Sequence, residues 1–239
     1  MKGAPAGDTR LRLLSAGAAK GVAEALQDAY FAVSGCAIAA TFGAVGAIRE
    51  ALDDGAPCDV IVLSAAMIDA LADEGRVIGG TVRALGRVPT AIAVRAGEPL
   101  PAIGDAAALR ASLLAAGNIF VPDPERATAG IHFAKVLRAL GIYDSVAAAL
   151  RPFPNGAIAM RALAASTEHG NIGCTQATEI RYTSGVSLAG PLPPQFALAT
   201  LYAAAVMRDA RDPDAARRWV EMLTGPESRE LRVAGGFEP

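Results

Sequence analysis

The sequence predicts an α/β fold with two doubly wound α/β lobes, joined by two crossing segments, and a ligand cleft between the lobes. Apolar, strand-like runs alternate with helix-like segments along most of the 239 residues. The run 58–65 (CDVIVLSA) is apolar almost throughout, as in a parallel strand buried on both faces. The pattern changes character in the middle of the chain, and we expect crossings near 83–92 and 186–198.

The first lobe is predicted to comprise residues 1–85 and 191–239. Its first helix shows clear helical periodicity, since Val22, Ala25, Leu26 and Ala29 fall on one face. The expected strands cover 10–17, 36–43 and 58–65, and the expected helices cover 19–35, 44–55, 66–77 and 213–225. This β-α repetition indicates a parallel sheet.

The second lobe is predicted to comprise residues 86–190. Its expected elements are a strand over 88–97, a helix after a proline-marked turn in 98–117, a strand-like run over 118–124, helices over 129–140 and about 156–168, and a strand with a turn over 170–180. The stretch 187–206 is expected to form a strand, a proline-rich crossing, and a second strand that continues as a helix.

Composition excludes several classes of partner. The net charge is −2 and aromatic residues make up 5% of the chain, so neither a basic field nor a stacking platform indicates nucleic acid. No apolar run reaches the roughly 20 residues of a membrane span, so no membrane insertion is expected. Residues 1–10 lack the apolar core of a signal peptide, which predicts a periplasmic protein if such a peptide was removed and a cytoplasmic one otherwise. No motif indicates a cofactor or a metal.

Four predicted strand-to-helix junctions are rich in small residues. They cover residues 15–18, 41–44, 128–130 and 155–157. Free N–H groups and the helix dipole at such junctions favour an anion, and small side chains let the anion approach the backbone. Alternatively, Ala and Gly simply fill tight turns in an alanine-rich chain. We interpret four such junctions, shared between two lobes, as an anion-binding cleft.

Several segments resemble the periplasmic molybdate-binding proteins of ABC transporters, and more closely a divergent branch of these type II solute-binding proteins. They include LSAGAAKGV (14–22), TFGAVGAIREAL (41–52), GAPCDVIVLSA (55–65), VPDPERATAGIHFAKVL (121–137), NIGCTQATEI (171–180), GPLPP (190–194) and the closing GGFEP (235–239). The resemblance covers about residues 11–239. It implies two α/β lobes that hold an oxyanion between helix N-termini, and an ABC permease as a partner.

The ligand positions of that family fall on Ala18, Ala44 (or Val45), Ala129, Ile158 and Gln176. The family has serine hydroxyls at the first two positions and a tyrosine at the last, and this chain has none of these groups. Each missing hydrogen bond to a buried ligand costs roughly 1–3 kcal/mol. We therefore expect a small organic carboxylate rather than molybdate or tungstate.

Other polar groups near the junctions are candidates to replace the missing ones. The full set of predicted ligand-binding residues is Ser15, Ala18, Lys20, Thr41, Gly43, Ala44, Ala129, Gly130, Ile158, Thr175 and Gln176. An ammonium, an amide and backbone N–H groups suit a planar carboxylate. Lys20 is alternatively a solvated residue of a first helical turn, and Gln176 a turn residue bonded to local backbone.

Two functions are compatible with this site. The first is a solute-binding protein that closes over a small anion and delivers it to an ABC-type permease. The alternative is a cofactor-free isomerase of a small polycarboxylate, because some relatives of these binding proteins resemble aconitate isomerase. Such an enzyme needs an acid/base group. Lys20 and His132 are the leading candidates, with Asp123 and Glu179 as further ones, and His132 is alternatively a packed or surface residue.

Overall fold

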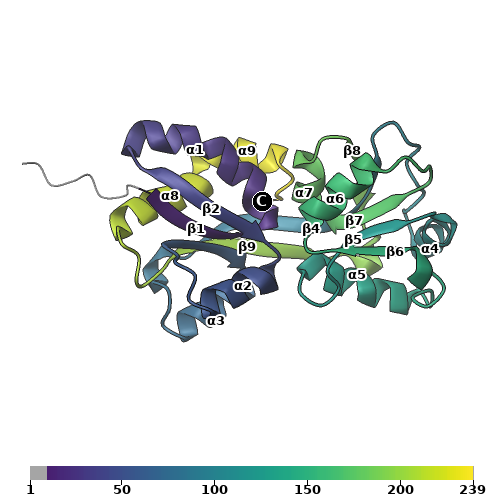
Figure 1. Ribbon diagram of the computed structural model, residues 1–239, viewed down its shortest axis with the longest axis horizontal. Helices are drawn as coiled ribbons and strands as arrows, with labels where there is room; N and C mark the ends of the chain where they lie inside the picture. Colours follow the sequence, from purple (N-terminus) through teal and green to yellow (C-terminus); the bar gives the residue numbers. More distant parts are fainter. Residues whose placement is uncertain (1–9, 239) are drawn as a thin grey trace, which may run out of the picture.

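The computed structural model describes residues 10–238, which form two β-sheets flanked by helices and connected by two crossings of the chain (Figure 1). The first sheet has the strand order β2-β1-β3-β9-β4. Its strands are β1 (Arg10–Ala16), β2 (Ala37–Gly43), β3 (Val60–Ser64), β9 (Ala199–Val206) and the first part of β4 (Arg83–Arg95). β1 pairs in parallel with β2 and β3. The side chains of residues 60–63 are completely buried, as expected for the apolar run that predicted this strand.

The second sheet contains the other part of β4 and four further strands. These are β5 (Ile119–Pro122), β6 (Leu150–Phe153), β7 (Ile172–Gln176) and β8 (Val186–Pro191). β5 pairs in parallel with β6 and β7, whereas β4 pairs antiparallel with β7 and β8. Both sheets carry helices on two faces (Figure 1).

The helices follow the strands in alternation over most of the chain. Those around the first sheet are α1 (Lys20–Ser34), α2 (Val45–Asp53), α3 (Ala65–Asp73), α8 (Pro213–Thr224) and α9 (Arg229–Ala234). Those around the second are α4 (Ala106–Ala115), α5 (Thr128–Ala139), α6 (Gly156–Ala165) and α7 (Ala177–Tyr182). Short 3-10 turns are η1 (Gly17–Ala19), η2 (Gly79–Thr81), η3 (Ala147–Ala149), η4 (Pro194–Phe196) and η5 (Pro226–Ser228).

The chain passes between the two sheets along β4 and returns through residues 192–198. Residues 83–89 of β4 pair with β9, and residues 90–95 pair with β7 and β8, so one strand belongs to both sheets. The predicted lobe boundaries, 85/86 and 190/191, fall inside β4 and at the end of β8. That exact division of the chain stays a prediction.

The crossing strands differ from the expected parallel arrangement. β9 runs antiparallel to both β3 and β4, because the chain returns from the second lobe in the opposite direction. The expected continuation of this stretch as a helix is also wrong, since residues 199–206 are strand throughout. Alanine favours a helix by propensity, but Ala203, Ala204 and Ala205 are buried between neighbouring strands, where a small side chain packs well.

Three further elements differ from prediction. The expected strand and turn over 170–180 is the strand β7 followed directly by the helix α7. The short strand β6 was not predicted, because its four residues include Pro152 and show no alternation. The six-residue helix α9 was also not predicted, because one and a half turns carry little periodicity.

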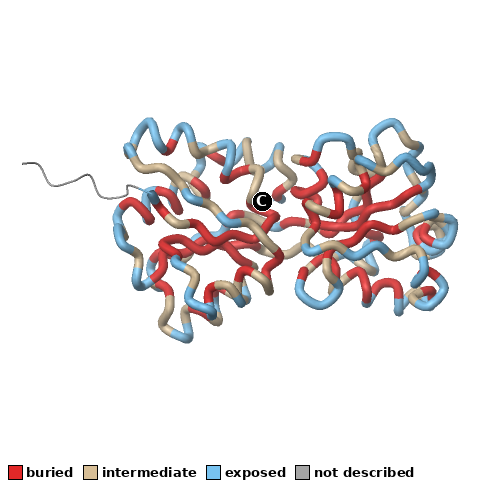
Figure 2. Tube along the Cα trace, in the orientation of Figure 1, coloured by how far each residue is buried: buried red, intermediate tan, exposed pale blue. Residues whose placement is uncertain are grey.

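Buried residues run along the inner strands of both sheets, whereas the edge strands β2, β6 and β8 are only half-buried or exposed (Figure 2). In the first lobe Tyr30 of α1 packs edge-on against Trp219 of α8, with the ring centroids 5.0 Å apart. Both side chains are fully buried. Within residues 10–238, no helix has the length and apolar character needed to span a membrane.

Asp59 ties three parts of the first lobe together. Its carboxylate accepts hydrogen bonds from the backbone N–H and the guanidinium of Arg12 on β1, and from the N–H of Arg211 before α8. The side chain is 1% exposed. Burial raises the pKa of Asp59, but these hydrogen bonds outweigh it, so the pKa lies below its ordinary value. The aspartate in GAPCDV therefore has a structural role.

We expect Asp59→Asn to lower the free energy of unfolding by about 1–3 kcal/mol at neutral pH, because it weakens the charge-assisted hydrogen bonds between the buried position 59 and the half-buried Arg12 guanidinium. A lowered pKa in the folded state stabilises the protein above the unfolded pKa of about 3.9, and this contribution is lost as the pH falls through the folded pKa. The difference between variant and wild type should therefore shrink in acid. Urea titrations at several pH values measure this, with the exposed Asp73→Asn as control. Equal stability of the two variants would contradict the assignment.

Candidate functional site

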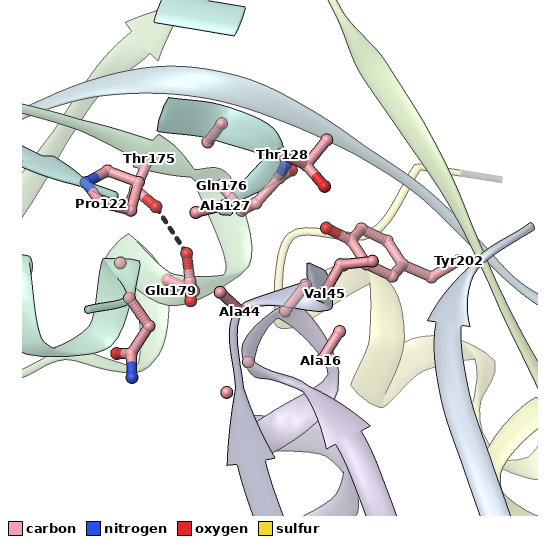
Figure 3. A pocket seen from close by; sticks show the side chains of 16 residues that line it. Ala16, Ala44, Val45, Pro122, Ala127, Thr128, Thr175, Gln176, Glu179 and Tyr202 are labelled. Atoms are coloured by element: carbon pink, nitrogen blue, oxygen red, sulfur yellow. Dashed lines mark hydrogen bonds between the residues drawn. The ribbon is translucent and has the colours of Figure 1, made fainter. Parts of the chain in front are cut away.

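A small cavity lies where the two lobes meet (Figure 3). The first lobe contributes Ala16, Gly17, Ala18, Gly43, Ala44, Val45 and Tyr202. The second contributes Pro122, Ala127, Thr128, Ala129, Asn155, Gly156, Thr175, Gln176 and Glu179. The volume open to the centre of a water molecule is about 20 Å³. This closed form therefore has room for one or two waters or for a compact group of similar size.

The N-terminal ends of two helices from different lobes meet at this cavity without a side-chain cap. α2 begins after Ala44 and α5 begins after Ala127, and neither residue can cap the free N–H groups of its helix. α6 begins after Asn155, whose side chain accepts the N–H of Ile158 at 3.0 Å. Uncapped N–H groups and the positive ends of the helix dipoles favour negative charge.

Gln176 supplies a polar side chain that has no hydrogen-bond partner among residues 10–238. It is the last residue of β7 and is 3% exposed. Neither its amide nitrogen nor its amide oxygen makes a hydrogen bond. A buried amide without partners is costly, so its position at the cavity wall indicates a contact that a ligand completes.

Glu179 places a carboxyl group inside the same cavity (Figure 3). It is 5% exposed, and the Thr175 hydroxyl donates a hydrogen bond to it at 2.5 Å. Burial raises the pKa of Glu179 above its ordinary value, although hydrogen bonds from the Thr175 hydroxyl and from the N–H groups of Gln176 and Ala157 oppose that shift. The carboxyl is therefore a group that can hold a proton inside the site.

The hydroxyl groups of Tyr202 and Thr128 lie across the cavity from Glu179 (Figure 3). Tyr202 on β9 is 2% exposed, and its phenol points toward Thr128 at the start of α5 (Figure 3). Burial and the charge of Glu179 raise the pKa of Tyr202, while a hydrogen bond with Thr128 opposes the shift, so the phenol is neutral at physiological pH. The family tyrosine is absent at position 176, yet a phenol reaches the cavity from another strand.

Contacts between the lobes close the cavity on one side. The N–H of Gly46 on α2 donates to the carbonyl of Arg126 in the second lobe at 3.2 Å. The Arg126 guanidinium also pairs with Glu50 of α2. A Cβ at Gly46 would lie 2.9 Å from the Arg126 oxygen, so glycine is needed for this approach.

Six of the predicted ligand-binding residues line this cavity: Ala18, Gly43, Ala44, Ala129, Thr175 and Gln176. Ala18 and Ala44 stand where the resemblance places the family's two serines. The first-lobe wall of the cavity therefore carries the methyl groups of Ala18 and Ala44, where the family has serine hydroxyls. The hydroxyls in the cavity come instead from Thr128, Thr175 and Tyr202.

Ser15, Lys20 and Thr41 lie near the cavity but are not among its lining residues. The Ser15 hydroxyl donates to the carbonyl of Ala16 at 3.0 Å, and Thr41 is exposed. The Lys20 ammonium lies 3.6 Å from Glu24 and 5.8 Å from the ring centre of Tyr182. The helical pattern of residues 19–35 predicts that Lys20 lies in the first turn of a helix. It does not predict that the ammonium lies beside Glu24 of the same helix and not in the cavity.

Gly130, Ile158 and His132 also lie outside the lining. A Cβ at Gly130 would overlap the backbone of 122–123, so this glycine serves the close packing of α5 against the end of β5. His132 Nε2 lies 2.7 Å from the carbonyl of Phe196 and so links α5 to the returning crossing segment. Ile158 is half-buried on α6.

Asp123 belongs to the turn before α5. Its side chain accepts hydrogen bonds from the N–H groups of Glu125 and Arg126 at 2.8 and 3.1 Å, so Asp123 shapes this turn.

Among residues 10–238, no three His, Cys, Asp or Glu side chains are grouped so that they could hold a metal ion. None of the described lining residues is Lys, Arg or His. The cavity therefore offers backbone N–H groups, hydroxyls, the amide of Gln176 and the carboxyl of Glu179.

Sequence comparisons place the chain beside bacterial solute-binding proteins. Residues 11–238 match the family described as bacterial extracellular solute-binding protein. An aconitate isomerase from Pseudomonas sp. is 27% identical over 240 residues, which cover 97% of this chain and 88% of the relative.

Structural comparisons identify the architecture. The periplasmic molybdate-binding protein of Azotobacter vinelandii superposes with a TM-score of 0.78 at 18% identity, covering 96% of this chain and 99% of the other. The sulfate-binding protein SubI of Mycobacterium tuberculosis H37Rv gives a TM-score of 0.74 at 17% identity, covering 96% and 86%. Two α/β lobes joined by crossing segments form the type II periplasmic-binding-protein fold, as predicted.

Gly156→Ala tests the packing around the Glu179 carboxyl. A Cβ at this position would lie 2.6 Å from Cδ of Glu179 and would overlap the Thr175 hydroxyl. We expect the variant to displace the Glu179 side chain and to lower the free energy of unfolding by about 1–3 kcal/mol. Gly104→Ala is the matched control, because no atom lies within 4 Å of its Cβ. Chemical denaturation measures both, and equal stability would show that the carboxyl is not confined as described.

Proposed function

Because the chain belongs to the family of bacterial extracellular solute-binding proteins, we propose that it captures a small anion between its two lobes and delivers it to an ABC-type permease. The anion is most simply an organic carboxylate. The protein then acts in the periplasm, the compartment named for its Azotobacter vinelandii neighbour. Ligand binding would favour the closed arrangement of the lobes over an open one.

One observation carries this proposal: the unpartnered amide of Gln176 lies in a cavity where two uncapped helices begin. The N–H groups of α2 come from the first lobe, and those of α5 and the Gln176 amide come from the second. An anion bound to all of them joins the lobes. Closure is then coupled to binding, as delivery to a permease requires.

A carboxylate fits this set of groups better than molybdate. Ala18 and Ala44 remove the two serine hydroxyls of the family's molybdate site, so a tetrahedral oxyanion loses two hydrogen bonds at the first lobe. An amide, neutral hydroxyls and helix N-termini can bind the two oxygens of a planar carboxylate. The cavity volume of about 20 Å³ favours a compact ligand over a tricarboxylate.

A thermal-shift screen with oxalate, malonate, citrate, cis-aconitate, sulfate and molybdate tests the proposal. We expect the compact dicarboxylates to stabilise the wild type more than molybdate does. Gln176→Leu should weaken the binding of oxalate by about 1–3 kcal/mol, because it removes both amide contacts. Thr41→Val is the control, since Thr41 is exposed and does not line the cavity. Strong stabilisation by molybdate with none by any carboxylate would contradict the ligand class.

An isomerase is the second candidate, favoured by the aconitate isomerase relative and by Glu179. A buried carboxyl with a raised pKa can accept a proton from an acidic C–H in its ionised form and return one in its neutral form. Lys20 and His132 do not line the cavity, which leaves Glu179 as the acid/base group in contact with a bound substrate. A tricarboxylate substrate would need the lobes to stand further apart than they do here.

Incubation with cis-aconitate separates the two functions. The transport proposal expects no trans-aconitate to form, as followed by chromatography. If trans-aconitate does form, Glu179→Gln should slow its formation by about 10²–10⁴-fold, the usual effect of a general acid/base. Lys20→Ala and His132→Ala should then stay within a few-fold of the wild type. Rapid conversion that survives Glu179→Gln would exclude Glu179 as the acid/base group.

A further inference from the structure

The ligand site contains a carboxyl group but no positively charged side chain among its described lining residues. Glu179 is 5% exposed, and its carboxyl is enclosed from both lobes. A Cβ at Gly17 of the first lobe would lie 2.6 Å from its Oε1, and one at Gly156 of the second would overlap its Oε2. Both glycines leave space that this carboxyl fills.

An ionised Glu179 carboxylate and an anionic ligand would repel each other in so small a cavity. Like charges at close range repel more strongly when water is excluded, and one of the two groups is then protonated. The uncapped N–H groups of α2 and α5 and the unpartnered Gln176 amide still attract an anion to this place. The conflict is removed if Glu179 carries a proton.

The surroundings of Glu179 agree with a neutral form. Burial raises its pKa, and the hydrogen bonds from Thr175, Gln176 and Ala157 reduce the shift without cancelling it. A neutral carboxyl can donate one hydrogen bond, which an anionic oxygen accepts. The same carboxyl would be hydrated if the lobes moved apart, because Gly17 belongs to the other lobe.

The elements packed against α7 supply no ion-pair partner that would hold Glu179 ionised. η1 and β8 carry no titratable side chain. The ammonium of Lys20 on α1 pairs with Glu24, and the guanidinium of Arg95 on β4 pairs with Glu98. The remaining titratable groups on these elements and beside the site are Asp28, Tyr30, Arg83, Arg87, Arg161, Cys174, Arg181, Tyr182 and Tyr202.

We propose that Glu179 is the proton-carrying group of the ligand site, so that the lobes close over an anion together with one proton, which the Glu179 carboxyl holds and donates to a ligand oxygen. This proposal rests on the anion-binding function proposed above and specifies the form in which the anion is bound. No covalent bond changes, and the proton comes from the solvent. The site thereby selects ligands whose oxygens accept a hydrogen bond.

Proton uptake makes affinity depend on pH. Over the range in which Glu179 is ionised in the free protein and protonated in the complex, affinity should fall by up to tenfold for each unit of rising pH. Oxalate and sulfate are suitable probes, because their own charge is constant from about pH 6 to about pH 9. Calorimetry in two buffers of different ionisation enthalpy counts the protons taken up.

The expected result is uptake of up to one proton per bound oxalate or sulfate by the wild type and none by Glu179→Gln. The amide of this variant can still donate a hydrogen bond, so it should bind with nearly the same affinity throughout this pH range. Glu230→Gln, which removes an exposed carboxylate, should behave as the wild type. Equal proton uptake by wild type and Glu179→Gln, or none by the wild type, would overturn the proposal.

Thr175→Val provides a second test if Glu179→Gln does not fold. It removes the hydroxyl that donates to the Glu179 carboxylate, so the pH dependence should move to higher pH. An unchanged profile would count against the proposal. Failure of the anion-binding function itself has a different signature, since no anion of the thermal-shift screen would then stabilise the wild type at any pH.

Discussion

The buried carboxyl of Glu179 is the constraint around which the ligand site is arranged. Gly17 and Gly156 are small where the carboxyl lies, and the Thr175 hydroxyl orients it. The lining residues that the structure describes include no cation, so the N–H groups of α2 and α5 supply the attraction for an anion. A site built in this way can hold negative charge only where its own carboxyl stays neutral.

The crossing strands explain why groups from distant parts of the sequence meet at this carboxyl. β4 belongs to both sheets, and β9 returns beside it to bring Tyr202 to the cavity. The Gly46 N–H bonded to Arg126 holds the helix starts of the two lobes together. Asp59 lies before β3, away from the cavity, and its hydrogen bonds to Arg12 and Arg211 stabilise the first lobe at that end of the sheet. Under the proposed function, the binding of an anion and the closure of the lobes are therefore coupled.

Local patterns were enough to predict most of the architecture and several residues that line the cavity. The apolar run at 58–65 and the small-residue junctions placed β3 and the starts of α2 and α5 where the structure has them, and with them Ala44 and Ala129. Gly130 looked like a ligand contact, but its small size serves packing against residues 122–123. Tyr202 could not be predicted, because an alanine-rich stretch gives no sign that it returns between two sheets as a strand. Glu179 was one carboxyl among many until its burial was known.

Infrared difference spectroscopy observes the protonation state of the Glu179 carboxyl directly. The wild type saturated with oxalate at neutral pH should show the carbonyl stretch of a protonated carboxyl, and Glu179→Gln should lack that band. A shift of the band in deuterium oxide would identify it as an acid. If the complex showed only carboxylate bands, the anion would be bound beside an ionised Glu179, and this residue would not be the proton-carrying group of the site.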